Sequence, residues 1–289
     1  MVLQLIITGL MYGVIYGLIA MGFVMILRAV GVVNFAQGDF LMVGAYVGYT
    51  LNQIAGIPIG WALGLTAVIM AAIGIGFQFI TYWPLRHSWD ITVVISTLGA
   101  SIALRELGRI IWGPAPVMPD AFSSATLKIG DLATVNWQFI VVIAISAVIM
   151  GLVYFMLEKT YLGHILQATA QDQYASSLVG IPVLVSICFT FAISIAITGV
   201  GGLLLGPVFS VTPYMGAVVG LSGFAAVILG GFGSVNGAII GGLIVGLAQE
   251  FAGVYISTTY ASAIVFILVI LILIVRPQGL MGEKIAEKV

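Results

Sequence analysis

The chain has 289 residues, of which 62% are hydrophobic and only 7% are charged, and its net charge is −1. Soluble domains carry about 25% charged residues, so this composition excludes a chain whose surface faces water, and it predicts that nearly all of the chain faces lipid or other helices. The net charge gives no indication of a nucleic-acid partner.

Apolar runs follow one another along the whole chain. A membrane-spanning helix needs about 20 mostly apolar residues. Runs near this length cover residues 3–27, 37–55, 59–82, 91–112, 137–157, 184–206, 215–232, 237–254 and 260–275. The run 215–232 is short and rich in glycine, so a half-helix buried among its neighbours is the alternative to a full crossing there. We therefore predict a single all-α polytopic membrane domain over residues 1–289, with eight or nine transmembrane helices.

The basic residues predict the orientation. The first run has no positive residue before it and is too long for a signal-peptide core, so we expect it to stay in the membrane. Basic residues follow alternate runs, at Arg28, Arg86, Lys159, Arg276, Lys284 and Lys288. Because positive loops concentrate in the cytoplasm, we expect this side to be cytoplasmic, with the N-terminus outside and the C-terminus inside. The opposite side holds Lys128 in the loop 113–136, where prolines and turn residues predict irregular structure.

Glycines recur at four-residue spacing in several runs. Small residues at this spacing let helix backbones approach closely in lipid, so they predict helix contacts. The glycines assigned to helix packing in this way are Gly9, Gly13 and Gly17 in the first run and Gly237 and Gly241 near the end. Gly44 with Gly48, and Gly60 with Gly64, repeat the pattern.

Polar residues interrupt the apolar pattern at the start of the second run, where Asn34, Gln37 and Asp39 occur close together. One interpretation is that Asn34 or Asp39 caps a helix. The other is that the cluster lines a passage through the membrane, because ionisable residues inside a span are costly unless they are paired or wetted.

Two later runs also carry ionisable residues. Arg105, Glu106 and Arg109 form either a polar patch near the outer mouth or, as we prefer, an interfacial group with an internal Glu106–Arg109 pair at i, i+3 spacing. Glu250 could contact a solute or lie at the membrane interface, and the sequence favours neither.

The polar stretch 158–183 contains a short amphipathic pattern. Ala168, Ala175 and Leu178 recur at helical spacing against polar neighbours. Gly180 is placed as a C-terminal cap and Pro182 as a stop. The segment is either a docking helix for an ATPase or an ordinary surface helix.

Motifs for catalysis are missing from the sequence. There is no GxxxxGK[ST] phosphate loop, no HExxH and no CxxC, and His87 and His164 have no catalytic partners nearby in sequence. We therefore expect neither an enzyme nor a metal site. The lone Cys188 lies in an apolar run and is interpreted as a small core residue.

Three segments resemble the permeases of branched-chain amino-acid ABC importers, of the LivH/LivM type and closer to the LivH half. The first is the segment Asn34-Phe35-Ala36-Gln37-Gly38-Asp39, followed by Gly44-Ala45-Tyr46. The second is Gln171-Asp172 with 175–181, and the third is 227–242 together with Arg276-Pro277-Gln278-Gly279-Leu280. Their order and spacing agree with the family over nearly the whole chain.

The resemblance implies a permease subunit in a bacterial inner membrane that imports branched-chain amino acids, or related amides, urea or aromatic acids, by alternating access. The implied partners are a second, LivM-like permease forming a heterodimer, two ABC ATPase subunits that carry the ATP and Mg²⁺, and a periplasmic solute-binding protein. No cofactor is expected on this chain. A secondary transporter or channel driven by an ion gradient is the alternative.

The resemblance also assigns residues. Its candidates for the solute path are Asn34, Gln37 and Asp39, to which we add Glu250 because it is an ionisable residue inside a predicted span. The ATPase-docking helix is assigned to Gln171, Asp172, Gln173, Tyr174, Ala175, Ser176, Ser177, Leu178 and Gly180. The family often carries two arginines where this chain has His164 and Gln167, and often a histidine at Gln37. These departures affect the expected docking electrostatics and the expected solute.

Overall fold

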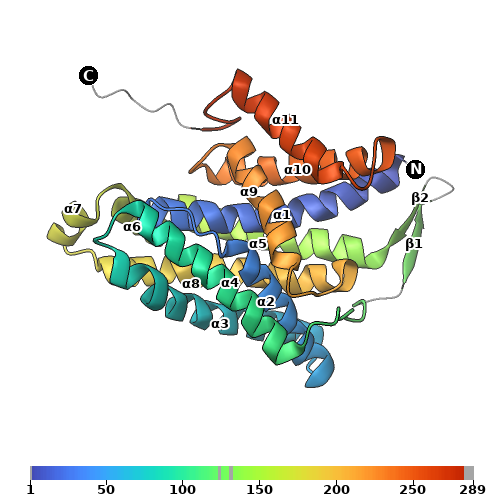
Figure 1. Ribbon diagram of the computed structural model, residues 1–289, viewed down its shortest axis with the longest axis horizontal. Helices are drawn as coiled ribbons and strands as arrows, with labels where there is room; N and C mark the ends of the chain where they lie inside the picture. Colours follow the sequence, from blue (N-terminus) through green and yellow to red (C-terminus); the bar gives the residue numbers. More distant parts are fainter. Residues whose placement is uncertain (1, 123–124, 130–132, 283–289) are drawn as a thin grey trace.

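Each of the predicted apolar runs is helical in the computed structural model, which describes residues 2–122, 125–129 and 133–282 (Figure 1). The corresponding helices are α1 (Val2–Val30), α2 (Gln37–Tyr49), α3 (Ile59–Phe77), α4 (Asp90–Trp112), α5 (Trp137–Lys159), α8 (Val183–Phe209), α9 (Met215–Gly230), α10 (Val235–Tyr255) and α11 (Ala261–Val275). Within the described residues, 6 helices are long and apolar enough to cross a membrane, and α9 and α11 are shorter apolar helices. The prediction of an all-α polytopic membrane protein is confirmed.

Shorter elements connect these helices. The π-helical turn η1 (Thr50–Ile54) extends α2, and the turns η2 (Gln78–Tyr82) and η3 (Trp83–Leu85) extend α3. Helices α6 (Tyr161–Gln171) and α7 (Gln173–Leu178) connect α5 to α8. The predicted irregular loop 113–136 contains an antiparallel hairpin of β1 (Thr126–Ile129) and β2 (Ala133–Asn136), in which Thr126 pairs with Asn136. The β-branched residues in these strands favour extended structure. The prediction of irregular structure relied on the turn residues earlier in the loop and therefore missed this preference.

Helix α1 lies at the centre of the bundle and is buried over most of its length, against α10, α8, α9 and α5. Glycines permit this contact. A Cβ at Gly13 would lie 2.9 Å from the Cα of Leu243, and one at Gly242 would lie 2.6 Å from the Cα of Gly17. The backbones of α1 and α10 therefore touch, which is the close approach that small residues allow in lipid.

The remaining glycines with four-residue spacing lie in different surroundings. Gly9 faces Leu247 of α10, while a Cβ at Gly237 or Gly241 would overlap the backbone of α9. By contrast, nothing lies within 4 Å of a Cβ built at Gly60 or Gly64. The packing interpretation is therefore wrong for these two within this chain, because the same spacing in α3 faces outward.

Two short helices shape the middle of the bundle. Helix α9 has 16 residues, so it is about 24 Å long, less than the roughly 30 Å hydrocarbon core. Helix α2 has 13 residues, and the non-helical segment 31–36 precedes it. Gly38, at the start of α2, contacts the first two turns of α9, since a Cβ at Gly38 would lie 2.7 Å from the Cα of Gly220.

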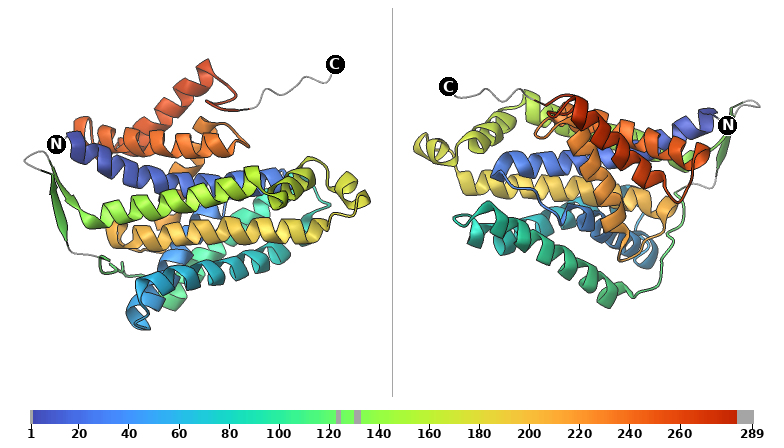
Figure 2. Two further views of the ribbon diagram at one scale, coloured as in Figure 1. Left: turned by 180° about the vertical axis from the view of Figure 1, so that it is seen from behind. Right: turned by 45° about the horizontal axis from the view of Figure 1, so that its top comes forward.

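The bundle has two distinct ends, which Figure 2 shows from two sides. Helices α6 and α7 protrude from one end, which we call the α6–α7 end. The N-terminus and the hairpin lie at the other, the hairpin end. Hydrogen bonds from Leu280 N to Leu229 O and from Met281 N to Gly230 O, both 2.9 Å, hold the segment after α11 beside the end of α9.

Candidate functional site

The polar residues Asn34 and Gln37, around the start of α2, are buried where α1, α2 and α8 meet. Gln37 is fully buried, and its Nε2 donates to Thr198 Oγ1 at 2.6 Å and to Ser194 Oγ at 3.1 Å. Its Oε1 accepts from Asn34 Nδ2 at 3.2 Å. Because a buried amide without partners would be costly, these bonds fix the packing of α2 against α8. Gln37 thus joins α2 to α8, Asn34 bonds to the Gln37 side chain, and neither residue lines a described cavity.

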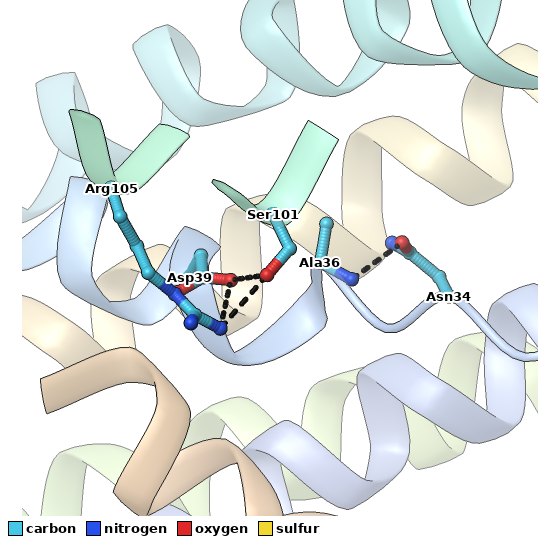
Figure 3. A network of polar contacts seen from close by, with 5 residues as sticks. All are labelled: Asn34, Ala36, Asp39, Ser101 and Arg105. Carbon is cyan, nitrogen blue, oxygen red and sulfur yellow. Dashed lines mark hydrogen bonds and ion pairs between the residues drawn. The ribbon is translucent and has the colours of Figure 1, made fainter. Parts of the chain in front are cut away.

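Asp39 has a different environment, shown in Figure 3. Arg105 Nε donates to Asp39 Oδ1 at 2.8 Å and Nη2 donates to Oδ2 at 3.2 Å, and Ser101 Oγ donates to Oδ2 at 2.5 Å. Ala36 is the N-cap residue of α2 and its side chain makes no capping hydrogen bond, while the Asp39 carboxylate is bonded to Arg105 and Ser101, so the capping interpretation is wrong for Asp39. Asn34 Oδ1 accepts from Ala36 N at 3.1 Å, which orders the turn before α2.

The arginines of α4 divide between two roles. Arg109 pairs with Glu106, with Nη2 and Oε2 2.7 Å apart on the exposed side of the helix, as the i, i+3 spacing predicted. Arg105 instead turns inward to Asp39. The sequence offered no local signal for this second pair, because the partner lies on another helix.

A cleft of about 160 Å³ opens beside this ion pair. Its charged and polar lining consists of Asp39, Ser101 and Arg105, and its apolar walls are Phe23, Phe35, Leu98, Leu221 and Phe224. Phe224 contacts both Phe23 and Phe35, with ring centroids 5.6 and 5.7 Å apart. Gly38, Gly216 and Gly220, where α2 and α9 are in contact, and Ala217 form the rest of the lining. Phe35, Leu98 and Leu221 are exposed, so the cleft opens to the side of the chain.

Glu250 lies apart from this cleft. It is half-buried on α10, where its Cβ is 3.4 Å from a Cβ built at Gly9, and it forms no hydrogen bond or ion pair within the described part of the chain. Its neighbour Gln249 accepts from Tyr16 OH at 3.0 Å. The structure therefore does not bring Glu250 together with Asn34, Gln37 and Asp39.

The segment 158–183 forms two helices with a break at Asp172. Asp172 Oδ1 accepts from Ala175 N at 2.9 Å and so caps α7. At the other end, Gly180 has a φ of +84°, and Ile181 N donates to Ser176 O at 3.0 Å. This is the Schellman arrangement, which ends α7 where the sequence placed its stop.

Apolar side chains on and beside α7 face away from the bundle. Tyr174, Leu178 and Val179 are 74%, 70% and 76% exposed. Of the other docking candidates, Gln171, Asp172, Ala175, Ser177 and Gly180 are exposed and Ser176 is buried. Gln173 points inward instead, and its Nε2 donates to Ala29 O and to Tyr82 OH, both at 3.3 Å. Helix α7 is thus attached to the ends of α1 and α3 while its apolar side chains stay uncovered.

The comparisons with known proteins agree with this architecture. The family of branched-chain amino acid transport system permease components matches residues 5–274. The high-affinity branched-chain amino acid permease LivH of Escherichia coli K12 is 33% identical over 99% of this chain and 97% of the relative. BraD of Pseudomonas aeruginosa is 31% identical over 99% of this chain and 98% of the relative. A ribose import permease, RbsC of Haemophilus influenzae, is 26% identical over 66% of this chain and 61% of the relative. The chain therefore belongs to the family of branched-chain amino-acid transport permeases, the membrane-embedded subunits of ABC importers.

Proposed function

We propose that this chain pairs with a second, LivM-like permease to import branched-chain amino acids or related small solutes by alternating access. Two separate ATPase subunits, which carry ATP and Mg²⁺, bind the α6–α7 end. A periplasmic binding protein delivers the solute to the hairpin end. The relatives LivH and BraD are named as branched-chain amino acid permeases, which supports this class of solute.

The observation that carries the proposal is the uncovered apolar surface of α7. Tyr174 and Leu178 are exposed on α7, and α7 protrudes from the end of the bundle opposite the hairpin (Figure 1). An exposed apolar group of this kind marks a contact with a partner. Because Gln173 attaches the same helix to α1 and to η2, a partner that moves α7 also moves the ends of two long helices.

The charged cleft supports a second permease. Arg105 has 27% of its side chain exposed within a membrane-spanning helix. A guanidinium facing hydrocarbon is costly, so such residues face protein or a water-filled path. The side of the chain that contains the cleft therefore suits the passage between two permease subunits.

The arrangement of basic residues supports the orientation. Arg28 contacts Glu158 at the end of α5, with Nη1 and Oε1 3.5 Å apart, and its Nε donates to Gly233 O after α9. Arg28 and Lys159 therefore lie at the α6–α7 end, and Arg276 lies four residues before Leu280, which bonds to the end of α9. Lys284 and Lys288 lie outside the described residues. We assign this end to the cytoplasm because positive residues concentrate there. The N-terminus is then periplasmic and the C-terminus cytoplasmic.

The docking surface can be tested by co-purification. We expect Tyr174→Glu with Leu178→Glu to lower the ATPase recovered with the purified permease by about tenfold or more, because charges would replace the centre of an apolar contact. Tyr260→Glu is the matched control, since Tyr260 is also exposed but lies between α10 and α11, at the hairpin end. Undiminished ATPase recovery with the double variant would show that α7 is not the docking element.

The alternative transport mechanism has its own test. Purified protein is placed in liposomes without any other subunit, and a sodium or proton gradient is applied. Solute uptake driven by that gradient alone would support a secondary transporter or channel. We expect uptake only when the ATPases, the second permease, the binding protein and ATP are all present.

A further inference from the structure

The guanidinium of Arg105 has unused hydrogen-bonding capacity in the cleft. An arginine has five N–H donors. The Nε and Nη2 groups of Arg105 are taken up by Asp39 and Ser101, at distances of 2.8 to 3.2 Å. Its Nη1 donates to nothing in the described part of the chain. Two N–H donors of a charged group are therefore left for a ligand.

The surroundings fix the direction of the guanidinium. Asp39 has only 1% of its side chain exposed, and it holds one edge of the guanidinium in a two-point contact. Arg105 also lies about 10 Å from the end of α4 at Trp112, given the rise of an α-helix. Its side chain is held by Asp39 of α2 (Figure 3). The free edge of the guanidinium remains beside the cleft.

The cleft combines this cation with an apolar lining. Phe23 and Phe35 both contact Phe224 in the lining, and Leu98 and Leu221 complete the apolar walls. The only carboxylate in the lining is Asp39, which is already paired. A ligand that suits this cleft has a carboxylate for Arg105 and an apolar group for the walls. Asp39 already balances the charge of Arg105, so what the cleft offers a ligand is the two unused Nη1 donors. A carboxylate accepts from these charged donors more strongly than the neutral oxygen of an amide or urea does.

We propose that Arg105 recognises the carboxylate of the transported solute, with Asp39 and Ser101 as the residues that position it. The solute class is then an apolar amino acid or carboxylic acid, in preference to an uncharged amide or urea. This inference rests on the proposed function, because it assigns a solute to the passage of that importer.

The test uses the complete importer in liposomes, with its second permease, ATPases and binding protein. Uptake of radiolabelled L-leucine, benzoate and acetamide is measured with the wild-type chain first. ATP-dependent uptake of at least one carboxylate is expected. Uptake of acetamide alone would overturn the inference and leave the importer function intact. Uptake of none of the three would contradict the proposed function and the inference with it.

Variants of Arg105 then test the residue itself. We expect Arg105→Gln to raise the KM for the carboxylate solute, or to lower uptake, by about tenfold or more, while ATP hydrolysis stimulated by the binding protein is retained. Arg109→Gln is the control, because it removes an exposed ion pair from the same helix. Unchanged KM and uptake in Arg105→Gln would overturn the inference, as would loss of the second permease from the purified complex.

A double variant separates recognition from a structural ion pair. Removing one partner of a buried pair leaves an uncompensated charge, whereas removing both relieves it. If the pair were only structural, Asp39→Asn with Arg105→Gln would transport better than Arg105→Gln alone. We expect no such recovery. If the double variant does not assemble, Arg105→Lys decides the question. Lysine keeps the positive charge beside Asp39 but lacks the planar guanidinium with its several donors, so we expect the KM for the carboxylate solute to rise. An unchanged KM would overturn the inference.

Discussion

Arg28 at the end of α1 and Glu158 at the end of α5 form an ion pair, with Nη1 and Oε1 3.5 Å apart, at the base of α6. Arg28 Nε also donates to the backbone oxygen of Gly233, in the turn between α9 and α10. The adjacent Ala29 O accepts from Gln173 of α7. The end of α1 thus contacts the docking segment, α5 and the α9–α10 turn together.

These contacts predict that Arg28 transmits movement between α7 and the rest of the bundle. We expect Arg28→Ala to lower the solute imported per ATP hydrolysed by about fivefold or more, because the link to the α9–α10 turn is lost. Uptake and ATP hydrolysis in the reconstituted importer measure this ratio. Glu158→Gln should have a smaller effect, since it leaves the bond from Arg28 to Gly233 in place.

The control for Arg28 is Arg86→Ala. Arg86 is exposed and lies over the ring of Trp83, 3.9 Å from its centroid, without connecting two helices. An unchanged import ratio in Arg28→Ala, or an equal loss in Arg86→Ala, would contradict the assigned role.

The glycine contacts predict a difference in stability between two substitutions of the same kind. A side chain at Gly241 would overlap the backbone of Ala226 in α9, so we expect Gly241→Leu to destabilise the fold by about 1–3 kcal/mol or more. Gly64→Leu should have little effect, because nothing lies within 4 Å of a Cβ there. Thermal unfolding of the purified protein in detergent compares the two. Equal transition temperatures would show that Gly241 is not at a tight helix contact.

The orientation predicts which engineered cysteines can be labelled. In a chain with Cys188→Ala that is expressed without the ATPases, which would cover α7, Ser177→Cys should react with a membrane-impermeant maleimide only from the cytoplasmic side. Thr259→Cys, between α10 and α11, should react only from the periplasmic side, and both parent residues are exposed. Intact cells and inside-out vesicles provide the two sides. The reverse pattern would invert the assigned topology.

Local patterns in the sequence were sufficient for the helices and for the end of α7. In lipid, a single run of about 20 apolar residues satisfies its backbone N–H and C=O groups by forming a helix. Each span can therefore be predicted from its own residues. Gly180 ends α7 for a similarly local reason, because a positive φ favours glycine there.

Contacts between helices were decided only by the tertiary structure. Asp39 and Arg105 are 66 positions apart, and each occurs in a segment that gives no indication of the other. The glycine spacing is the same in α1 and α3, yet Gly13 touches α10 while Gly64 faces open space. Spacing along one helix fixes which residues share a face, but only the packing of the other helices decides what that face meets.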